Sequence, residues 1–143
     1  MPINGFSTGR DMSLNFNTPS GPLTVSLVTK HSAKRKTADH PIIGMDGIVR
    51  PISFPQGWEG TIEVERQDSS IEDYFLQLDA NYYAGLNSTP ATITETITEV
   101  SGAISQYQYI GVVLKLEDAG DWEGDKSVKL KLSFLAQDKL KML

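Results

Sequence analysis

The chain has 143 residues, a formal net charge of −5 and no cysteine. This length is enough for one domain with its own core, and an apolar share of 39% is ordinary for a folded protein. The lack of cysteine excludes disulfides, thiolate metal sites and thiol catalysis, and the acidic balance disfavours tight binding of nucleic acid, which depends on Lys and Arg.

The N-terminal residues and the apolar runs bear on location. The first six residues, Met-Pro-Ile-Asn-Gly-Phe, contain neither a charged region nor an apolar core, so we expect no signal peptide and assembly in a cytoplasm. No apolar run approaches the roughly 20 residues of a membrane helix, so we expect no membrane insertion.

Alternation of apolar and polar residues predicts three strands in the first half of the chain. Pro51 indicates an edge or a bulge in the second of them. A polar stretch at about residues 30–44 separates the first strand from the second and is expected to be a long loop. The apolar positions of the three strands are Leu23, Val25 and Leu27, then Ile48, Ile52 and Phe54, then Trp58, Ile62 and Val64.

One amphipathic helix is predicted at about residues 70–84. Ser69 and Glu72 have the spacing of a capping box, and Gly85 lies where a left-handed C-terminal cap would fall. The apolar stripe has helical spacing and consists of Ile71, Tyr74, Phe75, Leu78 and Tyr82.

Two strong strands joined by an acidic turn are predicted after the helix. The turn comprises residues 117–125, which are rich in Gly, Asp and Glu. One strand places Ile110, Val112, Leu114 and Leu116 on one face, and the last places Val128, Leu130, Leu132 and Phe134 inside.

The segment from Ala91 to Val100 has high β propensity but no clean core face. Threonines occupy one face, and Ile and Glu alternate on the other. Such a strand suits either a watery channel or assembly interface, or an edge of the sheet guarded by charges. Both interpretations stay open at this point.

Candidate chemical groups are few. His31 and His40 have no second metal ligand at a suitable spacing and are expected to be solvated loop residues. The acidic turn is either an ordinary hairpin turn or a calcium site, although its spacing does not match an EF-hand. Neither a phosphate loop nor a nucleophile elbow occurs. We therefore expect no catalytic residue, no metal and no cofactor, and predict that the protein is not an enzyme.

The main basic cluster is Lys30 to Lys36, within the predicted loop. It is either a solvated loop tip or a surface that docks on an acidic neighbour.

The order of motifs resembles the tail tube proteins of contractile-tailed bacteriophages. The likeness runs from about Gly5 to the end and is strongest from Asp46 to Gly85. It is carried by Gly44-Met45-Asp46-Gly47-Ile48-Val49-Arg50-Pro51, Phe54-Pro55-Gln56-Gly57-Trp58-Glu59-Gly60, Ile62-Glu63-Val64-Glu65-Arg66, Tyr82-Tyr83-Ala84-Gly85, Tyr109-Ile110-Gly111-Val112 and Gly120-Asp121-Trp122.

The resemblance implies a mainly β fold over residues 1–143, a rolled β-sandwich or small barrel with one flanking helix. It implies a virion protein of the tail, whose homohexameric rings stack into a hollow tube. The genome passes through the lumen during ejection without specific binding. A sheath, baseplate proteins and tail terminator proteins are the implied partners, and the tube of type VI secretion is similar in fold.

On this resemblance we expect contacts between rings at Lys34, Arg35 and Lys36. We expect the lumen to be lined by Thr94, Glu95, Thr96 and Glu99. Two alternatives remain: a baseplate tube initiator or related inner tail protein of the same fold, and a small carbohydrate- or calcium-binding β-sandwich.

Overall fold

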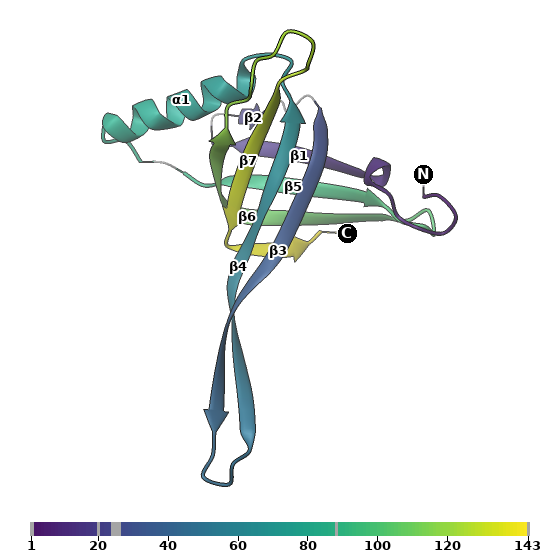
Figure 1. The fold of residues 1–143 in the computed structure, drawn as a ribbon, viewed down its shortest axis with the longest axis vertical. Helices are drawn as coiled ribbons and strands as arrows, with labels where there is room; N and C mark the ends of the chain where they lie inside the picture. Colours follow the sequence, from purple (N-terminus) through teal and green to yellow (C-terminus); the bar gives the residue numbers. More distant parts are fainter. Residues whose placement is uncertain (1, 20, 24–26, 88, 143) are drawn as a thin grey trace.

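The computed structural model describes residues 2–19, 21–23, 27–87 and 89–142. The chain is mainly β, with one α-helix in the described part (Figure 1). Its elements are η1 (Gly9–Asp11), β1 (Met12–Thr18), β2 (Gly21–Leu23), β3 (Val28–Ile43), β4 (Val49–Glu65), α1 (Ser70–Tyr83), β5 (Ala91–Thr98), β6 (Ile104–Asp118), β7 (Lys129–Ala136) and β8 (Asp138–Lys141).

The strands form one continuous antiparallel sheet that folds over on itself through β6. The order is β2-β1-β5-β6-β7-β4-β3, and β8 pairs with β6. The first half of β6 pairs with β5 as far as Val112, and its second half pairs with β7 from Val113 onward. The two halves of the sheet therefore face each other as layers of a rolled sandwich, which confirms the predicted fold class (Figure 1).

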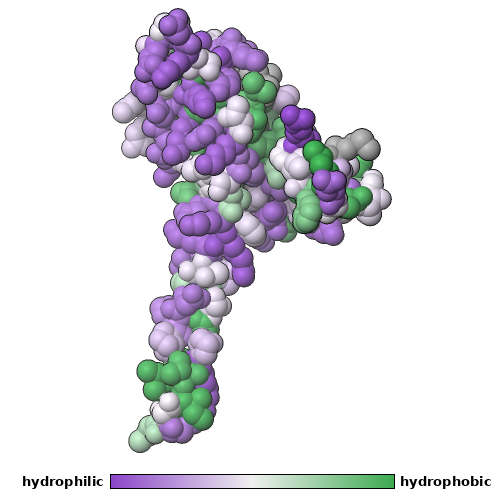
Figure 2. All heavy atoms as spheres, turned by 45° about the vertical axis from the view of Figure 1, so that its right-hand side comes forward, coloured by the Kyte–Doolittle hydropathy of each residue, from purple (hydrophilic) through white to green (hydrophobic). Residues whose placement is uncertain are grey.

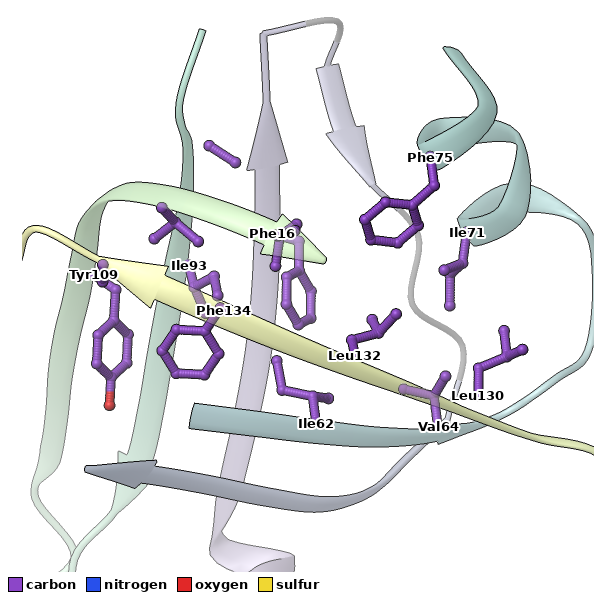
Figure 3. Close-up of a cluster of buried hydrophobic side chains, with 14 residues drawn as sticks. Phe16, Ile62, Val64, Ile71, Phe75, Ile93, Tyr109, Leu130, Leu132 and Phe134 are labelled. Atoms are coloured by element: carbon purple, nitrogen blue, oxygen red, sulfur yellow. The ribbon is translucent and has the colours of Figure 1, made fainter. Parts of the chain in front are cut away.

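The hydrophobic core lies between these two layers (Figure 3). The predicted inward face of the last strand is confirmed, because Leu130, Leu132 and Phe134 are at most 1% exposed. A fully buried side chain of this size contributes about 1.5–3 kcal/mol relative to an exposed one. The buried apolar set is Phe16, Ile62, Val64, Ile71, Phe75, Ala91, Ile93, Tyr109, Val112, Leu114, Leu130, Leu132, Phe134 and Ala136.

Helix α1 closes one end of the core with Ile71 and Phe75, whereas Tyr82, the last residue of the predicted stripe, is 75% exposed. Figure 3 shows Ile71 and Phe75 pointing from the helix toward Leu130 and Leu132. The predicted C-terminal cap is also confirmed. Gly85 has a φ of +74°, and the Leu86 N–H donates to the Asn81 carbonyl at 2.9 Å, five residues back, as in a Schellman motif.

The predicted capping box is wrong. The Ser69 hydroxyl donates to Asp73 at 2.9 Å, and Glu72 accepts from Arg66 at 2.6 Å. The cap comes from one residue earlier, where the Asp68 carboxylate accepts from the Ser70 N–H at 3.0 Å. Arg66 is the better partner for Glu72 because a charge-assisted bond is stronger than one to a neutral amide.

The predicted long loop at residues 30–44 is wrong. This segment belongs to β3, which pairs with β4 along nearly its whole length. The two strands predicted at residues 48–54 and 58–64 are one strand, β4, and Pro51 lies at a sheet edge as expected. Of the strand predicted at residues 23–27, Leu23 ends β2, and Val25 lies outside the described residues.

Candidate assembly interface

The outer part of the β3–β4 hairpin projects far from the sandwich (Figure 1). It comprises Thr37–Ile43 and Val49–Pro55. β7 pairs with β4 only from Trp58 onward, so these outer residues pair only with each other in the described part of the chain. Pro41 lies opposite Pro51 in this ribbon. Both lack an N–H, which makes the ribbon's edges poorer templates for adding another strand.

A glycine bulge sets the base of the hairpin. The pairing shifts register between Arg35 and Thr37, opposite Gln56 and Gly57. Gly57 has a φ of +89°, and a Cβ there would lie 2.4 Å from the backbone oxygen of Ala136. Only glycine fits both conditions, and such a bulge bends and twists a strand. Gly57 therefore sets the direction in which the hairpin leaves the sandwich.

The tip of the hairpin is apolar and exposed. The hydrophobic tip, defined as residues 42–49, includes Ile43 at 68% exposure and Met45 as fully exposed. Figure 2 shows it as a hydrophobic cluster at the end of a largely polar stem. Isolated exposed apolar residues are normal, but a contiguous group marks an interaction surface. Its large members are Ile42, Ile43, Met45, Ile48 and Val49.

The turn inside the hydrophobic tip is held by its own polar contacts. Asp46 accepts from the Ile48 N–H at 3.0 Å and pairs with Arg50 at 2.8 Å. The Arg50 guanidinium beside Asp46, together with this backbone bond, holds the pKa of the Asp46 carboxyl below its ordinary value. The Gly47 N–H donates to the Gly44 carbonyl at 2.9 Å. The turn thus presents its apolar residues in a defined shape.

Lys34, Arg35 and Lys36 lie on the stem of this hairpin, not in a loop. All three side chains are exposed, and Lys34 lies opposite Glu59 while Arg35 lies opposite Trp58. They therefore sit where the projecting ribbon joins the sandwich and remain accessible to a neighbour.

The four residues expected to line a lumen do not share one face of β5. Thr94 and Thr96 are half-buried and alternate with Glu95, which is 4% exposed, and Glu99 follows the strand in a turn. The expectation for Glu95 is corrected: its side chain points into the sandwich. The Ile and Glu positions of β5 form the core-facing side, which sequence reasoning had left undecided.

Glu95 is the centre of a buried polar cluster that joins the two layers. Its Oε2 accepts from the Tyr109 hydroxyl at 3.1 Å and lies 3.2 Å from His31 Nε2. A carboxylate only accepts, so Nε2 carries the hydrogen. The ammonium of Lys139 lies 3.8 Å from Oε1. β3, β5, β6 and β8 therefore meet at one carboxylate.

Aromatic rings surround the cationic side of this cluster. The Lys139 ammonium lies 5.0 Å from the Trp58 ring centroid and 4.6 Å from that of Tyr107. Burial raises the pKa of Glu95, but His31, Lys139 and Tyr109 outweigh burial, so its pKa lies below the ordinary value. Burial, followed by the charge of Glu95, raises the pKa of Tyr109, which therefore stays neutral and donates. The cluster is therefore a structural tie between the two layers.

The histidine expectation is wrong for His31 and partly right for His40. His31 is packed against Phe134 with ring centroids 6.0 Å apart and belongs to the buried cluster. His40 is exposed, but it lies on β3 and contacts Phe54. Over the described ranges, no three His, Asp or Glu side chains gather closely enough to hold a metal ion. Nor is any helix there long and apolar enough to cross a membrane.

Sequence reasoning missed the hydrophobic tip and the buried cluster. The tip had a local signal, because Gly44 and Gly47 bracket a turn between the apolar pairs Ile42-Ile43 and Ile48-Val49. For Glu95 the signal was its place between Ile93 and Ile97, on the apolar side of an alternating strand. Its partner His31 lies 64 residues away, and nothing in the sequence around His31 signalled this contact.

Comparison with known proteins shows the fold through structure alone. No family model and no curated protein sequence matches the chain. A chain in the cap that terminates the anti-feeding prophage tube matches with a TM-score of 0.66 and 7% identity, covering 99% of this chain and 94% of that one.

Two further solved structures contain a similar chain. One is the sheath–tube complex of an extracellular contractile injection system, PVC, with a TM-score of 0.63, 8% identity and coverage of 90% and 87%. The other is the 6-fold symmetrised baseplate of the anti-feeding prophage, with a TM-score of 0.57, 12% identity and coverage of 98% and 97%. The chain therefore has the tail-tube-like fold that occurs in contractile injection particles.

Proposed function

We propose that this chain is a structural subunit of the hollow inner tube of a contractile tail. Homohexameric rings would stack to form the conduit for genome ejection, assembled in the host cytoplasm and enclosed by a sheath between baseplate and terminator proteins. Two observations support it: the fold shared with contractile particles, and the projecting hairpin whose hydrophobic tip lacks a partner among the described residues. The tip carries most weight, because it needs a surface outside its own sandwich.

Several finer features belong to the same proposal. Lys34, Arg35 and Lys36 would contact the next ring from the hairpin stem. Thr94, Thr96 and Glu99 would face the lumen, and Glu95 would not. The net charge of −5 fits a conduit through which DNA slides, since few basic groups are available to hold phosphates. No catalytic residue is assigned.

A baseplate initiator or cap of the same fold is the second candidate. It is favoured by the matches to a baseplate chain and to a tube-terminating cap. Such a protein would form one closed ring, whereas a tube subunit would add ring upon ring.

Negative-stain electron microscopy of the purified protein separates these outcomes. Open-ended hollow tubes whose length grows with concentration support the tube subunit, and single rings that do not stack support the initiator or cap. Compact monomers at high concentration would overturn both. A calcium- or sugar-dependent rise in the melting temperature of such monomers would instead support the small ligand-binding sandwich.

The hairpin's part in assembly can be tested with a double substitution, Ile43→Ser with Met45→Ser. Both side chains are exposed, so the melting temperature of the unassembled protein should stay within a few degrees while assembly is lost. Val100→Ser removes a comparably exposed apolar group in the β5–β6 turn and serves as the matched control. Equal loss of assembly in both variants would remove the specific role of the hairpin.

A further inference from the structure

One of the two broad faces of the sandwich carries no charge. Strands β1, β5 and the first half of β6 form one layer (Figure 1), which turns Phe16, Ile93 and Tyr109 toward the core. The alternate residues of these strands point away from the core. Within these described strands, the outward side has no Lys, Arg, Asp or Glu. The hydroxyl and amide residues of this uncharged face are Ser13, Asn15, Asn17, Thr92, Thr94, Thr96, Thr98, Gln106 and Gln108.

The strand register makes the uncharged face continuous across three strands. Asn15 lies opposite Thr94, and Thr94 lies opposite Gln108. In the adjacent row, the Gln106 amide donates to the Thr96 hydroxyl at 3.4 Å. The side chains of neighbouring strands therefore contact each other and form one polar surface.

β8 forms the margin of this surface. Its Lys139 turns inward, with the ammonium 3.8 Å from Glu95, so Asp138 and Leu140 point to the outer side. Asp138 is therefore the first charged side chain on this side of the layer, and it lies opposite Ile110 at the edge.

The opposite face of the sandwich shows that the lack of charge is not general. β3, β4, β7 and the second half of β6 turn five basic and four acidic side chains outward. Lys34 lies opposite Glu59, and the Lys129 ammonium lies 3.9 Å from Glu65, so opposite charges meet across the strands. This charged face comprises Lys30, Lys34, Glu59, Glu63, Glu65, Lys115, Glu117, Lys129 and Lys131. It has the composition of a surface that bulk solvent covers, and the uncharged face does not.

We propose that the uncharged face forms a wet inner wall of the assembly, and that this wall is indifferent to the charge of what passes along it. The inference rests on the proposed function, because it takes a hollow assembly as given, and it adds the chemistry of the lumen. Glu95 would have made this wall acidic, but its side chain points into the core. The net charge of −5 is therefore carried by other surfaces.

The residue types explain both properties. Hydroxyl and amide groups can donate and accept hydrogen bonds, so they hold water without attracting ions of one sign. A wall without Lys or Arg releases no counterions from nucleic acid, and a wall without Asp or Glu does not repel it. The charged face adds little, because packed sheets lie about 10 Å apart, roughly one Debye length at physiological salt. Thr is also β-branched, so it supports the strand without adding a charge.

Thiol labelling tests where the uncharged face lies, because the chain contains no cysteine. Thr94→Cys is labelled before and after assembly, with a small maleimide and with a maleimide attached to a bulky polymer. We expect assembled tubes to admit only the small reagent to position 94. Thr61→Cys is the matched control, because Thr61 is equally half-buried in the middle of the charged face, and it should stay open to both reagents.

The charge of the wall is measured with a cationic and an anionic methanethiosulfonate of similar size. The ratio of their rates at Thr94→Cys should differ by less than about twofold between tubes and unassembled protein, at low and at high salt, since only fixed charges give a salt-dependent preference. Gln108→Glu, added beside Thr94→Cys, is the positive control. It repeats a carboxylate around the wall and should favour the cationic reagent severalfold at low salt. Asn15→Cys repeats the measurement on β1 in case Thr94→Cys prevents assembly.

The outcomes separate this inference from the proposed function. A preference above about fivefold for either reagent in tubes without Gln108→Glu, falling as salt rises, would overturn the inference and leave the proposed function standing. Bulky labelling of Thr94→Cys in tubes would place the face outside, and loss of the small label would show a dry contact; either result also overturns it. Protection of Thr61→Cys and Thr94→Cys alike would remove the specific placement. If the unmodified chain forms no tubes, the proposed function itself fails.

Discussion

Removing the buried Glu95 carboxylate should destabilise the fold more than truncating Thr94, its neighbour on the other face of β5. Glu95→Ala takes away the acceptor for the Tyr109 hydroxyl at 3.1 Å and for His31 Nε2 at 3.2 Å. It also leaves the Lys139 ammonium without the carboxylate that lies 3.8 Å away. Three polar groups from three strands would then lack their shared partner.

The expected size of the loss follows from these contacts. Breaking a buried charge pair by removing one partner costs about 3–5 kcal/mol. The side chain of Lys139 is 20% exposed and can turn toward water, so the lower end applies and we expect about 3 kcal/mol. For a domain of this length that corresponds to a fall in melting temperature of roughly 10 °C. Glu95→Gln keeps the shape and one acceptor and should cost less, about 1–2 kcal/mol.

Urea unfolding near neutral pH measures both variants against the unmodified chain, at a protein concentration where it is unassembled. Thr94→Ala is the matched control, because Thr94 is the preceding residue of β5 and faces the other side. It should cost less than about 1 kcal/mol, the whole span of β propensities. If Glu95→Ala and Thr94→Ala destabilise equally, the cluster does not tie the two layers and the reasoning is refuted.

Three further outcomes are expected. The pKa of Glu95 in the folded chain lies below its ordinary 4.5, so the unfolded chain takes up a proton first as the pH falls. The free energy of unfolding should therefore drop from about pH 4.5 downward. Urea titrations at several pH values measure this drop, and Glu95→Gln should flatten it. Gly57→Ala should cost more than about 2 kcal/mol, since φ is +89° and the added Cβ meets Ala136 O, whereas Gly124→Ala, with open space around it, should change the urea midpoint little. Leu132→Ala should lower the free energy of unfolding by about 2–5 kcal/mol, and a loss under 1 kcal/mol would contradict its place in the core.

The elements that sequence reasoning predicted correctly are those with one buried and one solvated face. β7 alternates Leu130, Leu132 and Phe134 with polar residues, and α1 repeats its apolar residues at helical spacing. In both elements, burial alone decides which residue type occupies each position. The periodicity therefore predicts the element without knowledge of the surface it packs on.

The outer β3–β4 hairpin could not be predicted from periodicity, for the opposite reason. In the described chain, no layer covers either face of its outer part, so Thr37 to His40 need not alternate, and a polar strand was taken for a loop. Pro41, at the end of this polar stretch, is compatible with a ribbon that has free edges. Strand pairing there comes from β4, the next strand along the chain.

The sequence signalled only one part of the buried cluster, the unusual position of Glu95. The alternation of Ile93, Glu95 and Ile97 places a carboxylate on an apolar face, which a single chain tolerates only with compensating partners. The sequence pattern left two interpretations of that conflict open, a watery channel or assembly interface and a sheet edge guarded by charges. The structure resolves it inside the sandwich, through His31 and Lys139. A charge on an apolar face thus indicates a partner, and sequence periodicity does not tell whether that partner is water, another subunit or the same chain.

The hairpin links stability to assembly. A two-stranded ribbon without a third strand or a packed face is marginally stable in water. Here Gly57 fixes its exit and the Asp46–Arg50 pair closes its tip, but the residues between them have only each other in the described structure. Docking of the hydrophobic tip on a neighbour would bury the side chains that the ribbon leaves exposed and so order it further. In the free chain the hairpin would then fray before the sandwich opens. Amide exchange in the hairpin should slow on assembly, while amide exchange in β7 stays unchanged.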